Sequence, residues 1–152
     1  MKTKELQDLL EYFGREQACY TSLLDLSRQQ KQLIEEGDID QLLSTLGHKQ
    51  QILGRVAEIE TKLRPYKDRW SELRQTMTAD DRSMIDLALS TVEDLLAELI
   101  STEQECEKLL VGQINVVQND LEEVSTARGV NDAYTMAVRR EPSQLLNYRE
   151  AL

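Results

Sequence analysis

The residues best suited to catalysis or metal binding are few and scattered. The chain of 152 residues contains one histidine, His48, and two cysteines, Cys19 and Cys106. A nucleophilic serine or cysteine would need His48 as its base, and nothing in the sequence places His48 near either cysteine. The two cysteines also form neither a CxxC motif nor a metal-ligand spacing. We therefore predict no catalytic residue, no metal site and no cofactor.

The acid-rich run from Glu103 to Glu107 is the strongest remaining candidate for a metal site. A di-iron helical bundle needs Glu-x-x-His pairs on separate helices. Here Thr45 stands three places before the single histidine. Successive positions of a helix also point in diverging directions around its axis. We interpret the run as a solvated helix face, with Cys106 on the apolar side.

Two further patterns could bind a ligand, and both have simpler structural interpretations. Tyr66 and Trp70 could form a stacking platform, but four residues apart on a helix they are more typical of core residues. Several arginines fall mostly outside the leucine stripes, which indicates exposed solubilising charge and not an anion pocket; they are Arg15, Arg28, Arg55 and Arg69. The chain is therefore not interpreted as an enzyme.

Helical periodicity extends through most of the chain. Apolar residues recur three and four apart over residues 3–36, 39–76 and 79–128, which predicts three long helices. Gly37 can end the first helix in the left-handed conformation, and Asp38 can cap the second. Pro65 predicts a kink or short break at Arg64–Pro65. Thr78 is the expected cap of the third helix.

These elements predict an all-α fold. The short connection at residues 37–38 forces the first two helices to run antiparallel. Residues 1–128 are expected to form an elongated antiparallel bundle of three long helices, followed by a C-terminal tail over residues 129–152. The tail is helical or mobile. It either folds back over the end of the bundle or docks on a partner, and the sequence leaves both open.

Charge restricts the classes of partner. The net charge is −10, which argues against nucleic acid and against anionic membranes as partners. Residues 79–128 carry twelve acidic side chains and three basic ones. No apolar run is long enough to cross a bilayer, and the first residues show no hydrophobic signal region. The expected location is the cytoplasm.

The third predicted helix is longer than the helices that would cover it. About 34 residues of the first helix cannot shelter the stripe of a helix of about 50 residues. The end of that stripe, together with apolar residues of the tail, is the predicted partner-binding site: Val116, Val117, Leu121, Val124, Tyr134, Met136, Val138, Leu145, Leu146 and Tyr148.

The sequence around the first turn resembles a known family. The segment from Gln32 to Leu43, with Leu23-Leu24-Asp25-Leu26 before it and Lys49-Gln50-Gln51-Ile52-Leu53 after it, is similar to FlgN-type flagellar export chaperones. The resemblance covers about the first sixty residues well and the remainder only in helical layout. In this family a tyrosine commonly lies beyond the last long helix, and Tyr134 is its counterpart here.

The resemblance implies a cytoplasmic, substrate-specific chaperone of flagellar type III secretion. Such a chaperone binds amphipathic C-terminal helices of hook–filament junction proteins, prevents their premature assembly and delivers them to the export apparatus. The alternative is a structural coiled-coil protein that self-associates through its third helix as a homodimer. Sedimentation would separate the two, because only the second requires a stable dimer with an occluded stripe.

Overall fold

The computed structural model describes residues 3–120, and every element in that range is a helix. The helices are α1 (Thr3–Glu36), α2 (Ile39–Asp68), α3 (Trp70–Thr76) and α4 (Ala79–Asp120). The predictions of an all-α fold and of a first helix over residues 3–36 are confirmed. The last eight residues of the predicted third helix, 121–128, lie outside the described residues, as does the tail.

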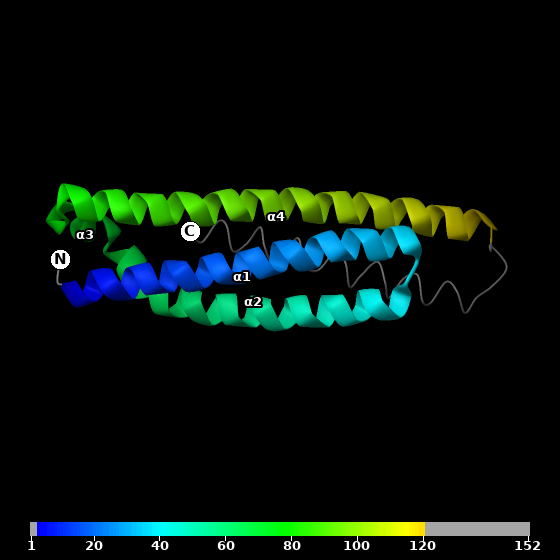
Figure 1. The fold of residues 1–152 in the computed structure, drawn as a ribbon, viewed down its shortest axis with the longest axis horizontal. Coiled ribbons are helices and arrows are strands. Elements are labelled where there is room, and N and C mark those ends of the chain that lie inside the picture. Colours follow the sequence, from blue (N-terminus) through cyan, green and yellow to red (C-terminus); the bar gives the residue numbers. More distant parts are fainter. Residues whose placement is uncertain (1–2, 121–152) are drawn as a thin grey trace.

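The three long helices lie side by side, with α1 packed along both α2 and α4 (Figure 1). α2 runs antiparallel to α1, and α4 returns parallel to α1. We call the end at which α1 begins the proximal end and the end with the α1–α2 turn the distal end. At the distal end α4 extends past that turn.

The buried positions of each long helix alternate in steps of three and four, as in the seven-residue repeat of helices that pack along their length. In α1 this pattern runs from Leu9 to Ile34, in α2 from Leu42 to Leu63, and in α4 from Ile85 to Leu110. The pattern holds one seam of each helix towards the shared axis. The core is therefore long and narrow, and its composition changes along the axis.

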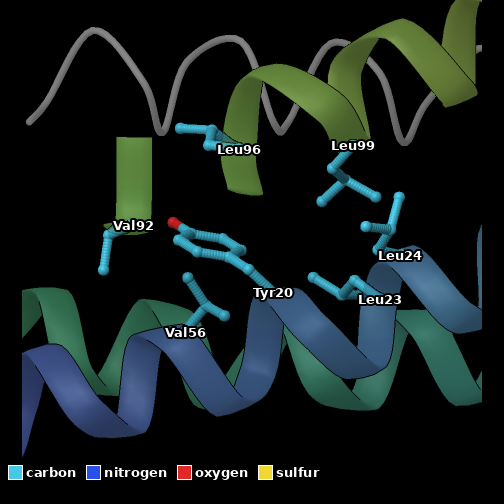
Figure 2. Close-up of a cluster of buried hydrophobic side chains, with 7 residues drawn as sticks. All are labelled: Tyr20, Leu23, Leu24, Val56, Val92, Leu96 and Leu99. Atoms are coloured by element: carbon cyan, nitrogen blue, oxygen red, sulfur yellow. The ribbon is translucent and has the colours of Figure 1, made fainter. Parts of the chain in front are cut away.

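Three apolar clusters follow one another along this core. The proximal cluster includes Leu9, Phe13, Leu63, Leu73 and Ile85. The central cluster surrounds Tyr20, whose ring lies between side chains of α2 and α4 (Figure 2). Within the described part of the chain the distal cluster is the smallest, and it consists of Ile34, Leu42, Leu46, Cys106 and Leu110. Each cluster combines residues of α1, α2 and α4, so the three long helices depend on one another for stability.

The second helix ends later than the predicted break. α2 continues through Pro65 to Asp68, and the chain turns at Arg69, where the backbone N–H bonds back to Tyr66 and Lys67. The predicted continuation to residue 76 is instead a separate short helix, α3. Packing explains the position of the turn, because it brings Trp70 edge-on against Phe13 and buries Leu73 in the proximal cluster. Arg64 remains helical, since tertiary contacts outweigh the local cost of proline.

The helix ends follow the predicted caps. Gly37 has φ +74°, and the N–H of Asp38 reaches back to the carbonyl of Leu33 at 3.1 Å, which closes α1 in a Schellman motif. The Asp38 carboxylate accepts the N–H of Gln41 at 3.1 Å. The Thr78 hydroxyl oxygen accepts the N–H of Asp81 at the same distance and caps α4.

Gly37 provides a direct test of the turn. Gly37→Ala is expected to lower the free energy of unfolding by about 1 kcal/mol, because a Cβ is disfavoured in the left-handed conformation. No atom lies within 4 Å of that added Cβ, so the cost is purely one of backbone conformation. Gly54→Ala is the matched control: its site in α2 is equally open, and alanine there should stabilise the helix. Urea unfolding measures both, and equal signs for the two variants would contradict this account of the turn.

Candidate partner-binding site

The residues considered for chemistry are placed mostly as the sequence indicated. His48 is exposed, as are Arg15, Arg28, Arg55 and Arg69. Tyr66 and Trp70 are half-buried and pack against the proximal cluster. Cys106 is buried, and its thiol donates a hydrogen bond to the carbonyl of Ser27 at 3.5 Å. Burial, reinforced by the nearby Glu103, raises the pKa of this thiol to about 12 and so keeps it protonated.

A buried polar layer separates the central cluster from the distal cluster. Lys49 of α2 forms an ion pair with Glu103 of α4, and both side chains are almost completely buried. The Lys49 ammonium also donates to Oε1 of Gln30 at 2.6 Å, and the Ser27 hydroxyl donates to Glu103. All three long helices therefore contribute to one layer, which holds them in a single register.

The interpretation of the whole 103–107 run as a solvated face was wrong at Glu103. Glu105 is exposed, but Glu103 lies on the seam, three residues before the buried Cys106. The spacing alone allowed this placement, whereas the charge of the side chain argued against it. Lys49, which makes burial of the carboxylate tolerable, is fifty-four residues earlier in the chain.

A second buried carboxylate lies between the proximal and central clusters. Glu16 of α1 is fully buried near Glu60 and Lys67 of α2, which form an ion pair with each other. Burial raises the pKa of Glu16 to about 7, and the charge of Glu60 adds to this increase. The charge of Lys67 and a hydrogen bond from Tyr20 act in the opposite direction.

The polar side chains of the layer that contains Lys49 and Glu103 bond to one another between the packed helices. Among residues 3–120 no group of three or more His, Cys, Asp or Glu side chains could hold a metal ion. Within the same range, no helix has the length and apolar character needed to traverse a bilayer.

The described part of the predicted partner-binding site lies on the distal end of α4. The side chain of Val116 is 59% exposed, and Val117 is half-buried. Ile34 of α1 and Leu110 of α4 share the distal cluster, so α1 ends alongside the turn of α4 that contains Gly112. Val116 and Val117 come after Gly112 in α4, and the last part of this helix projects past the α1–α2 turn in Figure 1. The other predicted site residues lie outside the described part of the chain: Leu121, Val124, Tyr134, Met136, Val138, Leu145, Leu146 and Tyr148.

Two exposed apolar residues of α2 were missed as site candidates. Ile39 is 43% exposed and Leu43 is 49% exposed, and both lie in the first turns of α2 beside the distal cluster. Leu43 follows the buried Leu42 and precedes the buried Leu46, so the leucine-rich run alone suggests core. Leu43 is out of phase with the buried positions of α2, and this offset is the signal that could have identified it as exposed.

Ion pairs between α1 and α4 show which flank of α4 faces α1. Arg28 and Lys31 of α1 pair with Glu98 and Glu105 of α4, with N–O distances of 2.6 and 3.3 Å. Near the distal end, an open hollow of about 730 Å³ lies against residues of α4: Gln104, Glu107, Lys108, Val111, Gly112 and Asn115.

Comparison with known proteins gives one result. A family model described as FlgN protein matches residues 1–139, which is most of the chain. No curated protein and no solved structure gives a significant match.

Proposed function

Because the chain belongs to the FlgN protein family, a family of flagellar chaperones, we propose that it is a cytoplasmic, substrate-specific chaperone of flagellar type III secretion. Its clients are the hook–filament junction proteins, whose amphipathic C-terminal helices it binds before export. Binding shields the apolar faces that would otherwise drive premature assembly. A second partner is the export apparatus, to which the client is delivered.

The observation that carries this proposal is the apolar surface at the distal end. Val116 is 59% exposed near the end of α4, the helix whose last part extends past the α1–α2 turn (Figure 1). Ile39 and Leu43 of α2 lie exposed at the same end. An amphipathic helix could bury these side chains by helix-in-groove packing. Each fully buried aliphatic side chain contributes about 1.5–3 kcal/mol, so a few such contacts can support binding.

The chemistry of the chain supports a binding role over catalysis. The buried Lys49 and Glu103 are paired with each other within the bundle, and the only histidine of the sequence is exposed. The acidic surface of α4 would keep a protein with exposed apolar residues soluble. The same exposed surface would also suit self-association. The experiment with Val116→Asp, described below, distinguishes this alternative from the chaperone function.

Substitution at Val116 tests the placement of the site. Val116→Asp is expected to weaken binding of a synthetic client C-terminal helix at least about tenfold, which corresponds to about 1.4 kcal/mol. The bundle should keep its melting temperature, because the side chain is exposed. Isothermal titration calorimetry of the full chain measures the affinity, and circular dichroism measures the melting.

Leu87→Asp is the matched control. Leu87 lies on the same helix, is 69% exposed and is near the proximal end, about 43 Å from Val116 along α4. The control should bind the client as the wild type does. Equal affinities of the two variants would remove the distal end as the site. A stable wild-type dimer that dissociates in Val116→Asp, together with absence of client binding, would favour the self-association alternative.

A further inference from the structure

The sides of α2 and α4 that face each other carry an apolar surface near the distal end. α1 packs along both helices, but α2 and α4 make little backbone contact with each other. On α2, Arg55 and Lys62 border a hollow shared with Arg15 of α1, so this flank faces α1. The opposite flank contains Ile39, Leu46 and Leu53 and therefore faces α4.

The same reasoning identifies the matching flank of α4. Glu98 and Glu105 pair with α1, so the opposite flank, with Ile100, Glu107 and Ile114, faces α2. Glu107 and Val111 at the edge of this flank also line the open hollow of about 730 Å³. We name as the α2–α4 face the incompletely buried apolar residues of these two flanks near the distal end: Ile39, Leu43, Leu53, Val111 and Ile114.

This face has the position that a fourth helix takes in a four-helix bundle. Ile39 and Leu43 remain 43% and 49% exposed there, although they adjoin the buried distal cluster. An additional apolar segment would extend that cluster, which among residues 3–120 is the smallest of the three. The question is which segment supplies it.

We propose that residues 129–152 of the same chain occupy the α2–α4 face when no client is bound. Thirty-two residues follow Asp120, the last residue of α4, which lies at the distal end beside this face. With an interruption at Pro142, two short helices over residues 132–140 and 143–151 would together span about 27 Å, whereas the stretch from Ile39 to Leu53 needs only about 21 Å. The segment is thus long enough, and it begins at the correct end of the bundle.

The sequence of the segment fits this surface. The apolar residues on each side of Pro142 follow the same steps of three and four as the buried positions of the bundle: Tyr134 and Val138 before it, and Leu145, Tyr148 and Leu152 after it. Residues 129–152 contain three basic and three acidic side chains. They therefore meet α4, with ten acidic and two basic residues, without net repulsion.

Charge and tethering favour this occupant over a second copy of the chain. The corresponding flank of a second copy would bring another strongly acidic α4 against the first, and like charges oppose that contact. A tethered segment acts at an effective concentration on the order of millimolar. Occupation of the α2–α4 face would protect the apolar residues from solvent and would compete with a client helix for the distal end. The competition depends on the function proposed above, but the occupation itself does not.

Hydrogen exchange on the full chain tests the occupation. In Leu145→Asp/Tyr148→Asp, exchange of the amides of residues 39–57 and 107–116 should become at least about fivefold faster, because two charges would no longer allow the segment to dock. Gln144→Asp/Asn147→Asp adds the same charges at the same spacing, one position earlier on the polar side, and should exchange as the wild type does. A synthetic peptide of residues 129–152 should restore protection to the first variant.

A client titration gives a second readout. Leu145 and Tyr148 are among the residues that the sequence predicts for partner binding, and our inference assigns them to the covering segment instead. If the segment covers the face nine-tenths of the time, its release should tighten the apparent Kd for a client helix about tenfold in Leu145→Asp/Tyr148→Asp. Loss of client binding in that variant would make the segment part of the client site and overturn our inference, while leaving the chaperone function in place. Unchanged exchange, or protection that depends on protein concentration together with a dimer in sedimentation, would overturn it as well. Failure of the wild type to bind any client would instead refute the proposed function, and the exchange result would still decide whether the segment docks.

Discussion

Replacing Lys49 with methionine is expected to lower the free energy of unfolding by about 3–5 kcal/mol. Lys49 is the cationic partner of Glu103, and both side chains are almost completely buried. Methionine would fill much of the space but would leave the carboxylate in an apolar environment without its counter-charge. Removing one member of a buried ion pair costs about this much, because the remaining charge is no longer compensated. Urea unfolding followed by circular dichroism measures the difference.

Two further variants separate this effect from loss of a surface charge. Lys62→Met, on an exposed position of the same helix, should change the stability by less than about 0.5 kcal/mol. The double variant Lys49→Met/Glu103→Leu should recover most of the lost stability, because a fully apolar layer avoids the desolvation cost of both charges. If Lys49→Met were no more destabilising than Lys62→Met, the ion pair would not be a buried feature of the protein in solution.

The layer has a second consequence for the arrangement of the helices. Ser27 and Gln30 of α1 hydrogen-bond within it, so a shift of any helix by one seven-residue repeat would leave Lys49 or Glu103 against apolar side chains. An apolar seam alone tolerates such shifts more easily. We therefore expect the double variant to be stable but less specific in register, which a second, concentration-dependent species in sedimentation would reveal.

The stability of the bundle is expected to fall by about 3 kcal/mol between pH 5 and pH 8.5 through Glu16 alone. Its pKa rises from 4.5 to about 7 in the folded protein because of burial, with Glu60 as the second cause. Each unit of pKa difference corresponds to 1.36 kcal/mol. The folded protein binds more protons than the unfolded chain in this range, so the free energy of unfolding decreases as the pH rises.

The pH range of this effect follows from the two pKa values. The stabilisation is fully present below about pH 4.5, declines as the pH approaches 7, and is absent above it. Glu16→Gln keeps the shape of the side chain without its charge. It should be more stable than the wild type at pH 8.5 and should lose this part of the pH dependence. Parallel urea titrations at several pH values measure both, and equal slopes for the two proteins would show that Glu16 ionises freely in the fold.

Much of the helical framework could be predicted because it depends on residues close together in the chain. The start and end of α1, the left-handed Gly37, and the caps Asp38 and Thr78 each follow from local backbone chemistry. The seam position of Cys106 follows from the helical repeat. These features need no knowledge of what packs against them.

The features that could not be predicted depend on residues far apart in the chain. The turn at Arg69 occurs where it does because Trp70 and Leu73 reach the proximal cluster, although Pro65 is the stronger local signal. For the candidate site, the helical periodicity identified a long apolar stripe on α4 and predicted Val116 and Val117 at its end. It did not identify Ile39 and Leu43, because a leucine-rich stripe does not show which of its flanks a neighbouring helix will cover.

By itself the sequence determined that this protein is helical, where its first helix begins and ends, and that its longest helix carries an apolar stripe with an acidic outer side. Only the tertiary structure decided which polar residues lie inside and which apolar ones remain outside. The burial of Glu103 requires Lys49 from another helix, and Leu43 remains exposed where α2 and α4 make little backbone contact. The physical reason is that periodicity and caps act within a few residues along one helix. Desolvation, by contrast, depends on all the helices that surround a side chain.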